Sequence, residues 1–399
     1  MSNDRFGGAL MKRILGITTI RSDYDLISTL YRLLNKDKDI DFRLLVSGAH
    51  LSTTYGTSVD LIEKDGLKIL LKIETLIDSN SCQSRLKTAS ILLQNSIDVV
   101  AQFSPNLIIY AGDREDVIIG GLLGTYLEIP TMHFFGGDHC KDGQADNPIR
   151  HATSKLSTIH IVSIKQHEER LLRMGELKKR IYTIGSIALD KFNDHTPITK
   201  NEIRKTFEIK ENFNYFALVI FHPLERKYCH FDFKNILDSL LNNNINAFVS
   251  YPNTDAGNKN IINVIEEYKK YHNFIFFKNL ERNLFLSIYK NSLFLIGNSS
   301  SGIMEAASIP IPVINVGLRQ INRLANENVI FCGTEIGSIN KAIEKVLSEK
   351  FRKKVSKIKN LYGNGKSSKR AYKIIKKLIK GDYLKRLLYK KEDALEEIK

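Results

Sequence analysis

The sequence has only four cysteines among its 399 residues, and this scarcity already excludes several classes of protein. Cys82, Cys140, Cys229 and Cys332 stand far apart, without the close spacing of a zinc site or the dense pairing of a small secreted domain. No apolar run approaches the ~20 residues that a membrane span requires. The N-terminus shows no secretory signal pattern. Together these absences predict a reduced, cytoplasmic protein.

Three nucleotide and metal motifs are also missing. The sequence contains no Walker A lysine motif, no GxGxxG and no zinc-ligand pattern, so tight use of ATP or of a dinucleotide is not indicated. With 43% apolar and 26% charged residues, the chain is nevertheless globular and long enough to bury the cores of two domains.

The net charge of +15 is concentrated at one end of the chain. Residues 341–399 contain 20 Lys/Arg and 7 Asp/Glu, so this segment alone carries +13. No helix-turn-helix, RNP or zinc-finger signature accompanies it, and we therefore expect no nucleic-acid partner. A solvated pair of basic helices and a surface that contacts a membrane or a polyanion both remain open as interpretations.

Short apolar runs alternate with helical patterns along the chain, which is typical of parallel sheets covered on both faces. The fold class we predict is α/β, with two doubly wound, Rossmann-like domains facing a cleft. We expect the domains at 11–189 and 190–366, followed by basic helices at 367–399. The predicted strands are 13–18, 42–47, 107–111, 131–135, 159–163 and 181–184 in the first domain, and 216–221, 247–251, 274–277, 293–296, 312–315 and 329–332 in the second. The predicted helices include 23–35, 85–103, 116–126, 165–174, 258–271, 338–348 and 367–380.

The most informative motif is the turn from Gly297 to Glu305, where an apolar strand meets a Gly/Ser turn before a helical pattern. Free backbone N–H groups and the helix dipole converge at such a point and favour an anion, usually phosphate. Glu305 falls about one turn into the helix, where its carboxylate could accept ribose hydroxyls. The turn therefore predicts a nucleotide site.

Acidic residues follow the ends of two strands in the first domain. Asp113 ends one of them, with Glu115 close behind, and helix capping is the alternative role for Asp113. Asp138 follows a glycine pair after the next strand, and Asp146 stands across a short loop. Paired carboxylates in one cleft can hold different protonation states, which suits proton removal and return. Asp146 and Pro148 are equally consistent with a plain helix start.

Other strand ends carry polar residues that are each compatible with more than one role. Arg21 could hold phosphate or sugar, while Asp23 could simply cap the next helix. His222 could be a phosphate donor, an acid or a structural histidine, and Asn253 could bind substrate or form a turn. Arg319 and Arg323 stand four residues apart, on one face if their segment is helical, where both could meet anionic oxygens.

Taken together, these pieces resemble the UDP-N-acetylglucosamine 2-epimerase family, in particular its hydrolysing branch in sialic-acid-type sugar synthesis. The resemblance covers roughly residues 12–332. Each motif is weak alone, but seven in this order at strand ends are specific. They are Arg21-Ser22-Asp23-Tyr24, Gly112-Asp113-Arg114, Gly136-Gly137-Asp138, Asp146-Asn147-Pro148-Ile149-Arg150-His151-Ala152, Tyr251-Pro252-Asn253-Thr254-Asp255-Ala256-Gly257, Gly297-Asn298-Ser299-Ser300-Ser301-Gly302 and Gly317-Leu318-Arg319-Gln320.

The resemblance implies a GT-B-like fold, a UDP site mostly in the second domain and a C-terminal helix that crosses back to the first. It also implies dimers or tetramers. Asp113, Asp138 and Asp146 become the candidate catalytic acids, with base and acid unassigned. The candidate substrate-binding residues are Arg21, Ser22, Asp23, Glu115, Asn147, Arg150, His222, Asn253, Asn298, Ser299, Ser300, Ser301, Gly302, Glu305, Arg319 and Arg323.

Three departures from the family pattern lie where the sugar should sit. Asp138 replaces the common Glu, the loop 139–145 is longer than in the sialic-acid branch, and Asn147 replaces the second acid of a common Asp-Asp pair. A 2,4-diacetamido-6-deoxy sugar, as in legionaminic-acid synthesis, is therefore a candidate beside N-acetylglucosamine. The nucleotide could be UDP or GDP.

The resemblance implies elimination of UDP to a glycal, followed by addition of water with inversion at C2. No metal or redox cofactor is required for this chemistry. A GT-B glycosyltransferase, a non-hydrolysing epimerase and a non-enzymatic polyanion-binding protein are the alternatives. The acidic loop 136–150 favours an epimerase over a transferase, and the Asn-Ser-Ser-Ser run favours the hydrolysing branch.

Overall fold

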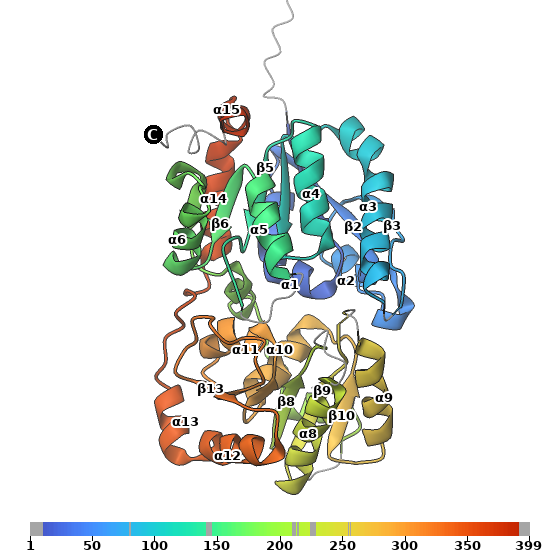
Figure 1. Cartoon of the computed structure of the whole chain (residues 1–399), viewed down its shortest axis with the longest axis vertical. Coiled ribbons are helices and arrows are strands. Elements are labelled where there is room, and N and C mark those ends of the chain that lie inside the picture. The colour runs from blue at the N-terminus through green and yellow to red at the C-terminus, as the bar shows by residue number, and fades with distance from the viewer. Residues whose placement is uncertain are drawn as a thin grey trace, which may run out of the picture.

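The computed structural model describes residues 11–79, 81–140, 146–209, 213, 215–223, 229–253, 255 and 257–390. Within this part of the chain, two parallel sheets form two domains stacked along the long axis (Figure 1). The predicted α/β class with two doubly wound domains is confirmed. The loop 139–145, the Tyr251–Gly257 motif and the basic tail are only partly described, since residues 141–145, 254, 256 and 391–399 lie outside these ranges.

The first sheet has seven strands in the order β3-β2-β1-β4-β5-β6-β7, and every described pairing is parallel. The central strand β4 is buried at all five residues, which explains its continuous apolar sequence. The strand β3 was not predicted, because its half-exposed edge position breaks the apolar run. The strands are β1 (Lys12–Thr18), β2 (Ile40–Ser47), β3 (Ile69–Ile73), β4 (Leu107–Ala111), β5 (Thr131–Phe134), β6 (Ile159–Val162) and β7 (Ile181–Thr183).

The second sheet has six strands in the order β10-β9-β8-β11-β12-β13, again parallel. Its order reverses beside β8, and ligands of doubly wound sheets bind at such a switch point, outside the carboxyl ends of the strands. The strands are β8 (Phe216–Ile220), β9 (Asn246–Ser250), β10 (Phe274–Phe277), β11 (Leu295–Gly297), β12 (Val313–Val316) and β13 (Val329–Cys332).

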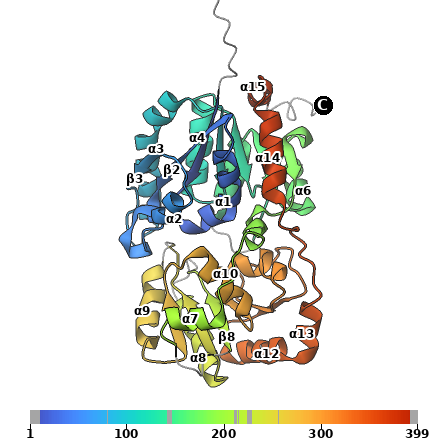
Figure 2. The same ribbon diagram turned by 180° about the vertical axis from the view of Figure 1, so that it is seen from behind.

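Helices cover both faces of each sheet (Figures 1 and 2). In the first domain they are α1 (Arg21–Asn35), α2 (Val59–Lys64), α3 (Cys82–Phe103), α4 (Glu115–Tyr126), α5 (Asp146–Leu156) and α6 (Lys165–Arg173). In the second they are α7 (Lys200–Thr206), α8 (Cys229–Asn242), α9 (Asn258–Tyr268), α10 (Arg282–Asn291), α11 (Ser300–Met304), α12 (Ile336–Leu347) and α13 (Glu349–Val355). None of the described helices is long and apolar enough to cross a membrane.

The chain crosses between the domains twice in the described region. The short 3₁₀ helix η4 (Ile187–Phe192) leads into the second domain, and residues 358–366 lead back. The returning chain forms α14 (Ser367–Leu378), which lies against α1 of the first domain, followed by α15 (Tyr383–Tyr389) (Figure 2). Asp190 of η4 accepts hydrogen bonds from the backbone N–H groups of Ser367 and Ser368 at 3.0 and 2.6 Å, so the two crossings are joined.

Candidate active site

The carboxyl ends of the two sheets face one another across a cavity of about 630 Å³, which we call the interdomain cleft. This volume lies within the range of small-molecule sites, ~300–1,000 Å³. Four predicted site residues, Glu115, Asn147, Asn298 and Gly302, do not line it. The predicted residues that do line it are Arg21, Ser22, Asp23, Asp113, Asp138, Asp146, Arg150, His222, Asn253, Ser299, Ser300, Ser301, Glu305, Arg319 and Arg323.

The turn after β11 forms the floor of the second domain's half of the cleft. Gly297 has a φ of +144°, and a Cβ there would collide with the carbonyl oxygen of Ile220, so only glycine fits. The Ser299 hydroxyl accepts a hydrogen bond from the Ser301 N–H at 3.3 Å. The helix that follows, α11, is only five residues long and passes into the 3₁₀ helix η5 (Ala306–Ser308). Exposed N–H groups and nearby arginines, more than a long helix dipole, therefore make this turn attractive to an anion.

Two predicted ligands at this turn support the backbone instead of facing the cleft. The Asn298 side chain donates to the His222 carbonyl at 2.9 Å and accepts from the His222 N–H at 2.8 Å. It thereby ties the end of β11 to the end of β8. Gly302 packs closely on the Val313 side chain, which leaves no room for a larger residue. Both residues shape the turn from behind.

Glu305 has a partner that the sequence did not reveal. Its carboxylate lies 2.9–3.0 Å from the Lys191 ammonium and accepts from the Ser301 hydroxyl at 3.0 Å. Lys191 belongs to η4, which spans the predicted domain boundary at 189–190. A ribose hydroxyl at Glu305 would therefore share that carboxylate with Lys191.

The segment that carries Arg319 and Arg323 is a series of turns and not a helix, so the condition under which the two would share a helix face is not met. Gly317 and Asn322 have φ values of +79° and +74°, which a continuing right-handed helix does not allow. The Gln320 amide donates to the Asn298 carbonyl at 2.8 Å and fastens the segment to the β11 turn. Both arginines still reach the interdomain cleft.

Asp138 is held in an ion pair across the cleft. Its carboxylate, in a residue only 3% exposed, accepts from the Arg323 guanidinium of the other domain at 2.7 Å. Arg150 lies 3.9 Å away and His167 3.4 Å away. Burial raises the pKa of Asp138, but the charges of Arg323 and Arg150 outweigh burial and hold the pKa well below its usual range. His167, on α6, was not identified from the sequence.

Asp113 contacts the Arg150 guanidinium directly. Arg150 also donates to the carbonyl oxygen of Phe135 at 3.0 Å, so it links the loops that follow β4 and β5. The capping alternative for Asp113 does not hold, because Arg114 occupies the N-cap of α4 and no side chain caps that helix. Asp113 therefore faces the cleft, oriented by Arg150.

Asp146 begins α5, and its pKa is shifted in the opposite direction from the pKa of Asp138. Burial and the carboxylates of Asp113 and Asp255 raise the pKa of Asp146 to about 7, against the opposing charges of Arg319 and Arg114. Asn147 bonds the backbone of Cys140 instead, donating to its carbonyl oxygen at 2.6 Å. The Asn147 side chain thus anchors the start of the 139–145 loop.

A second pair of buried acids consists of Asp23, which lines the cleft, and Asp116, which lies outside the cleft lining. Asp116, on α4, is 0% exposed, and neither of its carboxylate oxygens has a hydrogen-bond partner within the described residues. Burial and Glu115 raise the pKa of Asp116 to about 7, and burial together with Asp116 raises the pKa of Asp23 well above its usual value. Asp23 does not cap α1, whose N-cap is Ile20. Glu115 pairs with Arg85 at 3.0 Å, outside the cleft lining.

His222 and Asn253 lie at the ends of β8 and β9. Burial and the Arg319 charge lower the pKa of His222 to about 3, so the ring is neutral at physiological pH. The Asn253 amide donates to Asp255 at 2.6 Å, and the Asp255 N–H bonds back to it at 3.2 Å. Asn253 therefore forms the turn and also lines the cleft.

Further ion pairs join the two domains around the cleft, one between two of the predicted motifs and the others from outside them. Arg114 lies 3.0 Å from Asp255, and Arg282 lies 3.1 Å from Asp65 and 3.2 Å from Asp25. No sequence motif pointed to Arg282 or its partners, since they meet only through the fold. Among the described residues, no cluster of three or more His, Cys, Asp or Glu side chains is suited to a metal ion.

Comparison with known proteins gives a consistent pattern. The family model described as UDP-N-acetylglucosamine 2-epimerase matches residues 32–376. A Legionella pneumophila protein named UDP-N,N'-diacetylbacillosamine 2-epimerase (hydrolyzing) is 31% identical over 92% of this chain and 96% of its own length. A Campylobacter jejuni protein named GDP/UDP-N,N'-diacetylbacillosamine 2-epimerase (hydrolyzing) is 32% identical over 86% of this chain and 89% of its own.

A solved structure shows the same fold. The UDP-GlcNAc 2-epimerase of Neisseria meningitidis, crystallised with UDP-GlcNAc, superposes with a TM-score of 0.78. The match covers 92% of this chain and 100% of the other, at 18% identity.

Proposed function

The chain belongs to the UDP-N-acetylglucosamine 2-epimerase family, and we propose that it is a hydrolysing 2-epimerase of a nucleotide-linked N-acetylhexosamine. The observation that carries the proposal is the interdomain cleft, where an anion-binding turn from one domain faces three carboxylates from the other. The relatives named as hydrolysing enzymes support the hydrolysing chemistry over the non-hydrolysing one.

The leaving diphosphate belongs at the Ser299–Ser301 turn. The first N–H groups of α11 and the Arg319 guanidinium, which lies 3.5 Å from the Asn298 carbonyl oxygen, would stabilise the negative charge that develops as the C1–O bond breaks, and Arg21 lines the same cleft. The bonding electrons leave with UDP, the C2 proton goes to a base, and a C1=C2 double bond forms. Water then adds its oxygen to C1, while a proton returns to C2 from the other face.

Asp146 is our choice for the base that removes the C2 proton. A base with a pKa of about 7 is stronger than an ordinary carboxylate and is still available in its ionised form near neutral pH. Asp113, oriented by Arg150, is the second carboxyl group at the reacting carbons. The low pKa of Asp138 keeps its carboxyl group ionised, so it does not exchange protons near neutral pH. We therefore propose a structural role for Asp138, in which its ion pair positions Arg323 and joins the two sides of the cleft.

The substrate we propose is either UDP-GlcNAc or its 2,4-diacetamido-2,4,6-trideoxy analogue. The named activities of the Legionella and Campylobacter relatives favour the analogue, and so does the shorter Asp138 with its neighbouring loop. We further propose a cytoplasmic homo-oligomer, with domain boundaries near 189 and 366. The reduced cysteines and a nucleotide-sugar substrate favour that location.

The test is incubation of the protein with UDP-GlcNAc, UDP-N,N'-diacetylbacillosamine and GDP-N,N'-diacetylbacillosamine, followed by phosphorus and proton NMR. We expect free nucleoside diphosphate and the free 2-epimer of one sugar. Asp113→Asn is the matched control and should release neither product while it still binds UDP. A product that remains nucleotide-linked would indicate a non-hydrolysing epimerase, and no reaction with any of the three would contradict the proposal.

A further inference from the structure

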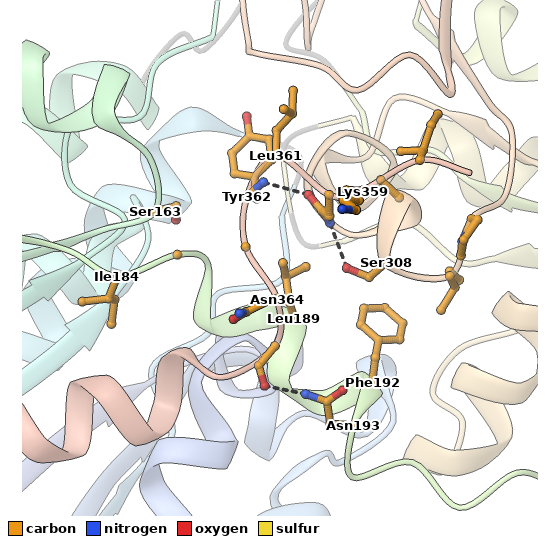
Figure 3. Close-up of a pocket in the computed structure, with 18 of the residues that line it drawn as sticks. Ser163, Ile184, Leu189, Phe192, Asn193, Ser308, Lys359, Leu361, Tyr362 and Asn364 are labelled. Carbon is orange, nitrogen blue, oxygen red and sulfur yellow. Dashed lines mark hydrogen bonds between the residues drawn. The ribbon is translucent and has the colours of Figure 1, made fainter. Parts of the chain in front are cut away.

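A second cavity, which we call the hinge pocket, lies beside the two chain crossings and apart from the interdomain cleft. Its volume is about 740 Å³. Figure 3 shows its walls, which include Ile184 from the first domain, Phe192 and Asn193 from one crossing, Tyr362 from the other and Ser308 from the second domain. A molecule in this pocket would touch both domains and both connections between them.

The charged side chains that line the hinge pocket are all positive. Lys290, Lys359 and Arg370 line it, and no Asp or Glu is among the lining residues. In the part of the chain that the structure describes, none of these three cations makes an ion pair. Arg114, Arg282 and Arg323, at the interdomain cleft, each pair with a carboxylate. Cations gathered around a cavity without a counter-charge favour an anionic ligand.

The surroundings of Lys290 and Arg370 also favour an anionic ligand. Burial lowers the pKa of Lys290, and its ammonium lies 3.0 Å from the neutral nitrogen acceptor of His195, not from a carboxylate. Arg370 uses two of its N–H groups on the Ile184 carbonyl and the Asn364 side chain, at 2.8 and 3.1 Å. Its guanidinium is therefore held in position with donors to spare.

The remaining walls of the hinge pocket suit a ligand that carries several hydroxyl groups. Side-chain amides and hydroxyls from Ser163, Thr183, Asn193 and Asn364 alternate with apolar surface from Phe192 and Leu361. The volume fits a single sugar ring with an anionic substituent. We propose that the hinge pocket binds an anionic monosaccharide, carrying a phosphate or a carboxylate, and that this ligand changes nucleotide affinity in the interdomain cleft.

The proposed effect of this ligand on nucleotide affinity follows from the structural elements that the two cavities share. Neighbouring residues of η4 line different cavities, Lys191 the interdomain cleft and Phe192 the hinge pocket, and the Lys191 ammonium lies 5.7 Å from the centre of the Phe192 ring. The same holds around η5, where Glu305 lines the cleft and Ser308 the pocket. Asn360 joins this segment to the second crossing by donating to the Met304 carbonyl at 2.7 Å and the Ser308 hydroxyl at 2.8 Å. A ligand that fixes these walls also fixes the Lys191–Glu305 pair.

The experiment is calorimetric titration of the full chain with N-acetylglucosamine 6-phosphate and with glucuronate, and with neutral N-acetylglucosamine as the control sugar. Saturating UDP is present in one series to occupy the interdomain cleft. We expect one or both anions to bind with or without UDP, and the neutral sugar not to bind. Binding of the phosphate or of the carboxylate alone identifies the anionic group.

Charge-reversal variants locate the site. Lys359→Glu should weaken anion binding at least about tenfold, since it removes one charge-assisted contact and adds a repulsion. Lys353→Glu, on the exposed α13 outside the pocket, is the matched control and should leave binding unchanged. Failure of both anions to bind, or equal affinity in wild type and Lys359→Glu, would overturn the site.

The coupling to nucleotide rests on the proposed function and is measured separately. UDP affinity should change by about fivefold or more when the anion is present, which is the lower range of typical allosteric coupling. An unchanged UDP affinity with a bound anion would overturn the coupling. If the protein binds the anion but no nucleotide at all, the proposed function fails while the hinge pocket stands.

Discussion

Carboxyl groups around the interdomain cleft differ in protonation because their neighbours differ. Asp138 faces two arginines and stays ionised, whereas Asp146 faces the carboxylates of Asp113 and Asp255 and titrates near neutral pH. The diphosphate of a nucleotide sugar would add further negative charge to this region. These differences in pKa are the basis on which we propose Asp146, and not Asp138, for proton transfer.

The pH dependence of kcat/KM should identify Asp146 as the base. Because only ionised Asp146 removes a proton, kcat/KM should rise as the pH rises through about 7. Asp146→Asn should lower kcat by roughly 10²–10⁴ and abolish this rise. Activity that falls through the same pH range would show that Asp146 acts as an acid, which contradicts the assignment.

The buried Asp116 should make the protein less stable as the pH rises. Its folded pKa, about 7, exceeds that of an unfolded aspartate, so the folded state binds more protons between pH 4 and 7 and loses stability across that window. The difference in free energy of unfolding between Asp116→Asn and wild type should depend on pH. Above pH 8 it should favour the variant by on the order of 1–3 kcal/mol relative to the difference below pH 4. Urea unfolding at several pH values measures this, with the exposed Asp60→Asn as the control. An equal difference at all pH values would contradict it.

Sequence patterns located most of the cleft residues because parallel strands bring their carboxyl ends to one edge. Asp113, Asp138 and Asp146 were found in this way, and so were Arg319 and Arg323. Lys191, His167 and Arg282 were not found, because they come from a linker and from helices that carry no motif. They pair with Glu305, with Asp138, and with Asp25 and Asp65, respectively. Long-range pairing of this kind leaves no local trace in a sequence.

At the scale of elements, α14 is held in place by η4. Asp190 accepts from the first two N–H groups of α14, where no side chain of the helix itself provides a cap. The Ser368 and Thr29 hydroxyls are 2.5 Å apart, and Tyr372 donates to Asp37 at 2.6 Å. These contacts bind the C-terminal helix to α1 of the first domain.

Removal of the Asp190 carboxylate should loosen α14. Asp190→Ala leaves two helix N–H groups without their acceptor and should lower the free energy of unfolding by about 1–2 kcal/mol, as for the loss of an N-cap. Asp190→Asn keeps one acceptor oxygen and should lose less. Denaturant unfolding compares the variants, and equal stability of wild type and Asp190→Ala would contradict this role.

The sequence predicted regular elements well where burial is uniform, as in β4 and β5. It failed where tertiary contacts override the local pattern. Helical periodicity after Gly297 continues for only five residues as α11, and the Arg319–Arg323 segment turns because Gly317 and Asn322 adopt left-handed backbone. Element lengths near the site depend on the partner domain, which the sequence pattern does not contain.

At the scale of the whole molecule, buried ion pairs hold the two domains in a closed arrangement. Arg323 and Asp138 form the most enclosed of the pairs described above that connect the two domains, with side chains 7% and 5% exposed. Either single substitution leaves a buried charge without its partner, which costs about 3–5 kcal/mol. Closure of the cleft and stability of the fold are therefore coupled through this pair.

A double-mutant cycle on Arg323→Met and Asp138→Asn should show a coupling free energy above 1 kcal/mol in denaturant unfolding, since a buried pair loses far more than an exposed one. The exposed pair Lys72–Glu63 provides the control, with an expected coupling below about 1 kcal/mol. Equal coupling in the two cycles would mean that the Asp138–Arg323 pair does not hold the domains together.

The most direct test of the central claim is turnover in D₂O with the substrate identified by NMR. Elimination followed by addition of water requires the C2 proton to leave and a solvent deuteron to replace it. The account predicts free sugar of inverted C2 configuration that carries deuterium at C2, together with free nucleoside diphosphate. Retention of the original C2 hydrogen in the released sugar would contradict it.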